Sequence, residues 1–236
     1  MNLHLFLRMT AVLAIAVTLS GCGRSASFRY KLTLAVNTPD GVKRGTSVTE
    51  WAFWEVSIPA RGTPHKLRGE ALYLDLGPGT KPLIALLTSH LHAKPGGTVW
   101  DWPSDELLSR LYGPLWRDDF LGGISRLANM RGLRSIAPAD LPDLVTFANV
   151  NDPKSVFEVD PTDLQATFGQ EITWNAITFE MTDEPITTGI EKKLPWLPEY
   201  FQKNFRLDGS QYGSNRNIAN QLSWSDFDQS GNLKSN

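Results

Sequence analysis

Apolar and polar side chains alternate along residues 28–36, FRYKLTLAV. Phe28, Tyr30, Leu32, Leu34 and Val36 fall on one side of an extended chain, and Arg29, Lys31, Thr33 and Ala35 fall on the other. This period of two predicts a β-strand with one buried face. The region that follows must therefore include a sheet that is covered on at least one side.

The sequence predicts two β-hairpins in the first half of the chain. Residues 37–41, NTPDG, predict a turn, and residues 47–58 predict the antiparallel partner of the first strand. A second hairpin is predicted from residues 70–76 and 82–90, which a glycine- and proline-rich stretch joins. We expect this hairpin to extend the same sheet.

The rest of the chain mixes short helices with strands. The patterns predict helices over 104–113, 117–130 and 161–168, and strands over 144–150, 155–160 and 171–183. Ser104 is expected to cap the first of these helices and Asp160 the third. In the last strand the apolar face switches between Trp174 and Ile177, which indicates a β-bulge. Without regular βαβ alternation, the prediction is a single α+β domain with a mostly antiparallel sheet built from hairpins, plus short helices.

The first 22 residues have the organisation of a secretory signal. Arg8 precedes an apolar run from residue 9 to residue 19, and small residues and Cys22 follow. Residues 19–22, Leu-Ser-Gly-Cys, resemble the bacterial lipobox, after which the signal is removed and the cysteine becomes the lipidated first residue. The resemblance implies lipidation at Cys22. No aspartate follows Cys22, which in such lipoproteins implies the periplasmic face of the outer membrane.

This resemblance divides the chain into four parts. Residues 1–21 are the expected lipoprotein signal peptide, 22–27 a short lipid-anchored tether, 28–206 the α+β domain and 207–236 a polar, flexible C-terminal tail. The alternative is an ordinary signal peptide cut near Gly21, which would leave Cys22 as a spare thiol in an oxidising compartment.

Charge and cysteine content exclude several classes of function. Without the signal the chain carries 22 basic and 25 acidic residues, and no basic cluster is present, which argues against a nucleic-acid partner. Cys22 is the only cysteine, so its acylation leaves no disulfide, no zinc thiolate and no thiol nucleophile. We expect no cofactor.

Four segments together look like a family of uncharacterised bacterial envelope proteins. They are RYKLTLAVNTPDGV, GEALYLDLG, LPDLVTFAN and EMTDEPITTGIEKKLPWL. The resemblance implies that this arrangement recurs as a unit, and it implies no activity and no site.

His90 and His92 are the best metal-ligand candidates, because residues i and i+2 of an extended chain project from one face. A third ligand would have to be His65 or a carboxylate such as Asp101. Zinc held in this way would support a metal-assisted hydrolase of envelope material. The simpler interpretation is two solvent-facing histidines at the end of a strand.

Tryptophan supplies the candidate ligand-binding residues. Trp100, Trp102 and Trp116 could stack on a sugar ring or a peptidoglycan fragment, although tryptophan more often packs in cores. Trp51 and Trp54 lie on opposite faces of one predicted strand.

Residues 226–233 match the first eight positions of a calcium-binding loop, but the chain ends before the glutamate that closes such a loop. We therefore expect a polar tail there. The leading hypothesis is a lipid-anchored binding or assembly module that contacts another envelope protein or the cell wall, and the alternative is the hydrolase that uses His90 and His92.

Overall fold

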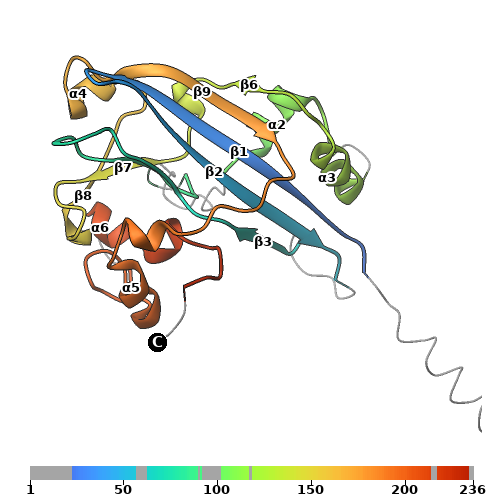
Figure 1. The fold of residues 1–236 in the computed structure, drawn as a ribbon. Helices are drawn as coiled ribbons and strands as arrows, with labels where there is room; N and C mark the ends of the chain where they lie inside the picture. The colour runs from blue at the N-terminus through green and yellow to red at the C-terminus, as the bar shows by residue number, and fades with distance from the viewer. Residues whose placement is uncertain are drawn as a thin grey trace, which may run out of the picture.

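A computed structural model describes residues 23–56, 63–89, 91, 102–116, 119–213 and 217–233. These residues form an α+β fold with two antiparallel sheets and five short α-helices. Figure 1 shows the long strands β1, β2 and β9 side by side, with α2 and α3 toward the right of the view and β7, β8, α5 and α6 at the lower left. The predicted α+β class is confirmed.

The first sheet is built on one long hairpin. Strand β1 (Ser25–Thr38) pairs along its whole length with β2 (Gly41–Trp54), and Thr38 lies opposite Gly41. The sheet order is β3-β2-β1-β9-β6, with β3 (His65–Arg68), β6 (Arg134–Ser135) and β9 (Thr173–Met181). The five apolar residues from Phe28 to Val36 are all buried, as the alternation predicts.

The predicted bulge in the last strand is confirmed. Ala35 lies opposite Ala176, but Val36 lies opposite Trp174, so Asn175 is the extra residue in the β1–β9 ladder. The bulge turns Trp174 and Ile177 to the same buried side of the sheet despite their odd spacing.

The hairpin predicted from residues 70–90 builds a second sheet, so the expectation that it extends the first is wrong. Strands β4 (Leu72–Leu74), β5 (Leu83–Ala85), β7 (Leu144–Phe147) and β8 (Val156–Glu158) pair in the order β4-β5-β7-β8. Strands β5 and β7 are buried at every position, because both faces of this sheet are covered. A strand that is buried on both faces lacks the alternation of apolar and polar residues, so its sequence does not indicate which sheet it joins.

Gly45 allows the two sheets to pack closely. A Cβ atom on Gly45 would lie 3.0 Å from the Leu72 Cδ2 atom and 3.2 Å from the Tyr73 carbonyl oxygen. Only a residue without a side chain leaves room for β4 at this point of β2.

Two hydrophobic cores lie on the two faces of the second sheet. The first core fills the space between the sheets and includes residues of α2 (Asp105–Tyr112) and α3 (Phe120–Ala128). The second core lies between the second sheet and the C-terminal elements η3 (Ile190–Lys192), α5 (Leu197–Lys203), α6 (Ile218–Gln221) and η4 (Trp224–Asp226). The short helix α4 (Leu164–Phe168) is capped by Asp163, whose side chain accepts from Ala166 N–H, and not by Asp160 as predicted.

Residues 182–189 carry the chain from the first sheet to the second core. Figure 1 shows this segment leaving β9 and running across β1 and β2. Thr182 donates to the Arg29 carbonyl at 3.0 Å, the Lys31 ammonium contacts the Glu184 carboxylate at 2.5 Å, and Thr187 donates to the Val48 carbonyl at 3.0 Å. The crossing therefore lies on the polar face of the first sheet.

A tether is expected over residues 22–27, but residues 25–27 already belong to strand β1. Ser25 already pairs with Trp54 as the first residue of β1. The Arg24 carbonyl accepts from Glu55 N–H at 2.9 Å, and Arg24 N–H donates to the Glu55 carboxylate at 3.3 Å. The chain is thus fixed to the sheet from Arg24 onwards.

The expected flexible tail is wrong for residues 207–213 and 217–233. Leu207, Leu222 and Phe227 are fully buried in the second core, and the rings of Phe227 and Trp196 lie 5.4 Å apart. The segment is polar overall and its few apolar residues are irregularly spaced. Because they follow neither a helical nor a strand period, the sequence pattern does not predict their burial.

Replacing Phe227 by alanine should lower the free energy of unfolding by about 3–5 kcal/mol, the usual cost of deleting a buried aromatic ring. Urea denaturation of the protein checks this value. Tyr212→Ala is the matched control in the same segment, because this ring is 78% exposed, and its effect should stay within about 0.5 kcal/mol. Equal effects of the two substitutions would mean that the segment is not part of the core.

Candidate functional site

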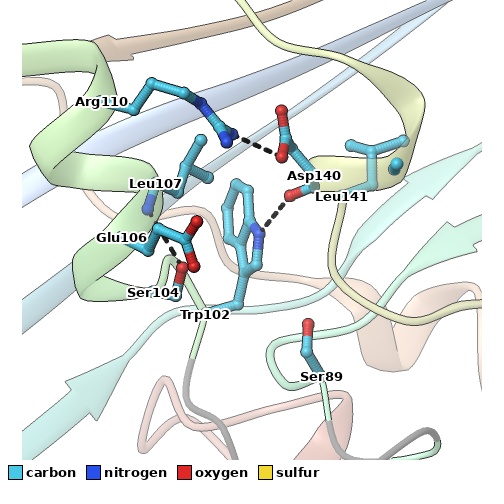
Figure 2. Close-up of a pocket in the computed structure, with 9 residues that line it drawn as sticks. Ser89, Trp102, Ser104, Glu106, Leu107, Arg110, Asp140 and Leu141 are labelled. Carbon is cyan, nitrogen blue, oxygen red and sulfur yellow. Dashed lines mark hydrogen bonds and ion pairs between the residues drawn. The ribbon is translucent and has the colours of Figure 1, made fainter.

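A pocket lined by the predicted site residue Trp102 lies between α2 and η1 (Pro138–Asp140) and has a volume of roughly 280 Å³. Figure 2 shows the ring of Trp102 between these two elements. The lining residues are Ser89, Trp102, Ser104, Glu106, Leu107, Arg110, Ala139, Asp140 and Leu141.

Local sequence signals fix helix α2 at the pocket. The Ser104 hydroxyl oxygen accepts from Leu107 N–H at 3.2 Å, which confirms the predicted N-cap. Leu107 and Leu108 are buried, so the helix has a fixed rotation about its axis. Glu106 and Arg110, four residues apart, therefore lie on one exposed stripe that borders the pocket.

Asp140 connects the two walls. Its backbone carbonyl accepts from the Trp102 indole N–H at 2.8 Å, and its carboxylate contacts the Arg110 guanidinium at 2.5 Å. Both side chains of this ion pair are partly exposed, so it contributes little to stability. It does hold a cation and an anion side by side at the pocket wall (Figure 2). The carboxylate of Glu106 lines the same pocket.

Ser89 adds a hydroxyl group from a third segment. Its oxygen is buried and has no hydrogen-bond partner among the residues that the structure describes. Donors and acceptors of this kind usually find a partner, so Ser89 is a group that a polar ligand could satisfy. The pocket thus offers a hydroxyl, a guanidinium and two carboxylates, a set suited to a small polar or zwitterionic group.

Trp102 belongs mainly to the core. Its side chain is 4% exposed and packs edge-on against Tyr30 at 5.3 Å and Phe179 at 5.6 Å. Its carbonyl accepts from the Tyr30 hydroxyl at 3.3 Å and from the Trp51 indole N–H at 3.2 Å. Trp102 therefore forms a wall of the pocket and offers no open face for stacking on a sugar.

Trp116 lies outside this pocket. Its ring packs against Phe120 at 5.4 Å and close to Gly123, where a Cβ atom would lie 3.1 Å from the indole. The structure therefore does not bring Trp102 and Trp116 to a common binding surface. The candidates Cys22, His90, His92 and Trp100 lie outside the described residues.

No group of three or more His, Cys, Asp or Glu side chains that could hold a metal ion occurs among the described residues. His65, a proposed third ligand, packs against Trp51 at 5.3 Å and Phe53 at 5.9 Å. In the segment that resembles a calcium loop, the Asp226 carboxylate accepts from the Thr88 hydroxyl at 2.9 Å and from Ser223 N–H at 2.7 Å. Asp226 therefore fastens the C-terminal segment to the fold.

Glu70 and Asp228 form a buried carboxylate pair that the sequence patterns did not indicate. They face each other in a short antiparallel bridge, and each is 1% exposed. The flanking hydrogen bonds run from Ala71 N–H to the Phe227 carbonyl and from Gln229 N–H to the Gly69 carbonyl. In this arrangement the two facing residues exchange no backbone hydrogen bonds, so their side chains approach closely on one face.

The two carboxylates have different partners. Glu70 accepts from the backbone N–H groups of Gly189 and Ile190, both at 2.8 Å, and so holds the end of the crossing segment. One oxygen of Asp228 accepts from Ser230 N–H at 2.7 Å, and the other is buried with no partner among the described residues. Burial raises the pKa of Glu70 to about 7, helped by the nearby charge of Asp228, and burial also raises the pKa of Asp228.

No family model, curated protein or solved structure matches the chain. Within the described ranges, every helix is too short or too polar to cross a bilayer.

The carboxylate pair should make stability depend on pH. The pKa of Glu70 is raised from 4.5 to about 7, so its protonation stabilises the fold fully below pH 4.5, and this contribution is lost as the pH rises through 7. Asp228→Asn removes the neighbouring charge and puts an N–H donor where the free oxygen lies. We expect this variant to be about 1–2 kcal/mol more stable than the wild type at pH 8 and little changed at pH 4.

Urea denaturation between pH 4 and pH 8 measures this effect. Asp40→Asn, at an exposed position in the β1–β2 turn, is the control and should follow the wild-type profile. A loss of stability in Asp228→Asn at every pH would show that the charge of Asp228 beside Glu70 does not destabilise the fold at high pH.

Proposed function

We propose that this protein is a lipid-anchored cell-envelope protein that acts as a binding or assembly module. In this proposal, acyl chains on Cys22 hold it at the periplasmic face of the outer membrane. Its partner is a polar group displayed by another envelope protein or by the cell wall. The excess of acidic residues is consistent with a partner other than nucleic acid.

One observation supports the proposed anchor: strand β1 begins only three residues after the single cysteine of the sequence. Cys22 ends the lipobox-like sequence, and Ser25 is already a strand residue. Each buried CH₂ group of an acyl chain contributes about 0.8 kcal/mol to membrane binding, so several chains would hold the protein durably. A strand that starts three residues after Cys22 would then be attached to the membrane with almost no linker.

The pocket between α2 and η1 supports the binding role. It lies on well-fixed elements, and its lining combines Arg110, Asp140 and Glu106 with the buried hydroxyl of Ser89. Its roughly 280 Å³ is near the lower limit for small-molecule sites, which suits recognition of one exposed chemical group of a larger partner.

Cys22→Ser should remove the acyl mass from the protein and release it from sedimented membranes of the native host. Intact-mass spectrometry and membrane fractionation measure the two effects. Cys22→Ser combined with Ser25→Cys is the control, because it keeps one cysteine in the chain but moves it away from the lipobox-like sequence. Acylation of this control, or an unacylated wild type, would overturn the proposed anchor.

A photo-crosslinking residue in place of Glu106 should capture the partner in living cells, because Glu106 is exposed and borders the pocket. The same residue in place of Glu171, an exposed position outside the pocket lining, is the control. We expect one dominant adduct from position 106 that Arg110→Ala reduces several-fold, either a discrete protein or the insoluble cell wall. Equal labelling from both positions, or labelling that Arg110→Ala leaves unchanged, would contradict the binding role of the pocket.

A further inference from the structure

The folded domain has a defined end where the chain arrives from Cys22. Figure 1 shows the start of β1 and the end of β2 side by side at this end. Arg24 is already hydrogen-bonded to Glu55, and two residues of extended chain span at most about 7 Å. The Cα atom of Cys22 can therefore lie at most about 7 Å from that of Arg24, which keeps any acyl chain on Cys22 close to the end of the sheet.

Exposed apolar side chains lie at the same place. Trp54, the last residue of β2, is 38% exposed, and Val56, two residues further, is 44% exposed. Trp51, three residues earlier on the other face of the strand, is buried in the first core. The exposed parts of Trp54 and Val56 are not covered by any described residue, so these apolar surfaces face the surroundings.

A lysine accompanies them. Lys66 in β3 lies opposite Ala52 in β2, and therefore on the same face of the sheet as Trp54. Its side chain is exposed. Tryptophan and lysine together are typical of protein surfaces at the boundary between lipid and water, where the indole ring sits among the headgroups and the ammonium reaches the phosphates.

We infer that this end of the domain, formed by Arg24, Trp54, Val56 and Lys66, rests in the headgroup layer of the bilayer. The inference rests on the proposed acylation of Cys22, and it adds that the domain has a fixed orientation. Strands β1 and β2 then rise away from the membrane. The opposite end of the hairpin, next to Val42, lies roughly 40 Å along the strand from Trp54 and faces away from the bilayer.

The chain provides a matched pair of reporter positions. Val42 and Val56 are almost equally exposed, at 46% and 44%, but they lie at opposite ends of the hairpin. Cys22 is the only cysteine, so once it is acylated, Val56→Cys or Val42→Cys supplies a unique thiol for a nitroxide spin label.

The test uses the full-length acylated protein in vesicles of phosphatidylethanolamine and phosphatidylglycerol. We expect the label at position 56 to be several-fold less accessible to a water-soluble nickel chelate than the label at position 42, and more accessible to oxygen. Equal accessibility at the two positions in protein whose acyl mass is present would overturn the inference and leave the anchor intact. Absence of the acyl mass would overturn the proposed anchor, and the inference with it.

A second measurement needs no added cysteine. Brominated lipids in the same vesicles should quench part of the tryptophan fluorescence, and Trp54→Phe should remove most of that quenching. Because Trp54 is partly exposed at the end of a strand, this variant should keep the wild-type circular dichroism spectrum. Quenching that is unchanged in Trp54→Phe would contradict contact of this residue with lipid.

Discussion

The second sheet has apolar side chains on both faces, and the rest of the fold follows from the need to cover them. Alternate residues of β5 and β7 enter the two cores: Leu83, Ala85 and Leu144 face the first, and Ile84, Val145 and Phe147 face the second. The first sheet covers one face, with Gly45 as the point of close approach. The other face needs a separate cover, which residues 190–213 and 217–233 supply. The C-terminal segment is thus an obligate layer of the structure, although its composition is that of a tail.

Local sequence patterns predict an element correctly wherever one of its faces is buried and the other is exposed to solvent. The alternation in β1, the bulge opposite Val36 and the capping of α2 by Ser104 all follow from side chains and backbone within a few residues. The same reasoning failed for the hairpin of residues 70–90 and for the C-terminal segment. A strand buried on both faces has no period of two, and scattered apolar residues such as Phe227 have no period at all. Which surfaces cover them is decided by residues far away in the chain.

The candidate sites were harder to predict for the same reason. Tryptophan content suggested stacking surfaces, yet Trp102 is a core residue whose edge borders a pocket. The polar groups of that pocket come from three separate segments, around Ser89, Arg110 and Asp140, and no spacing in the sequence connects them. Glu70 and Asp228 likewise meet only because the C-terminal segment pairs with the chain before β4. The burial of Glu70 depends on contacts with residues 189, 190 and 228, so no local pattern around residue 70 predicts it.

The proposed anchor and the proposed binding pocket are joined by rigid structure. Tyr30 and Trp51, which donate to the Trp102 carbonyl, lie on the two strands whose ends meet near Cys22. Tyr30 is five residues along β1 from Ser25, so about 17 Å of strand separates the pocket wall from the end that we infer rests on the bilayer. Both strands are continuous over this length, so no flexible segment lets the pocket rotate relative to the end of the sheet. A domain held in this way would present its pocket at a fixed height and angle, which lowers the entropy cost of meeting a partner confined to the same membrane or to the adjacent wall.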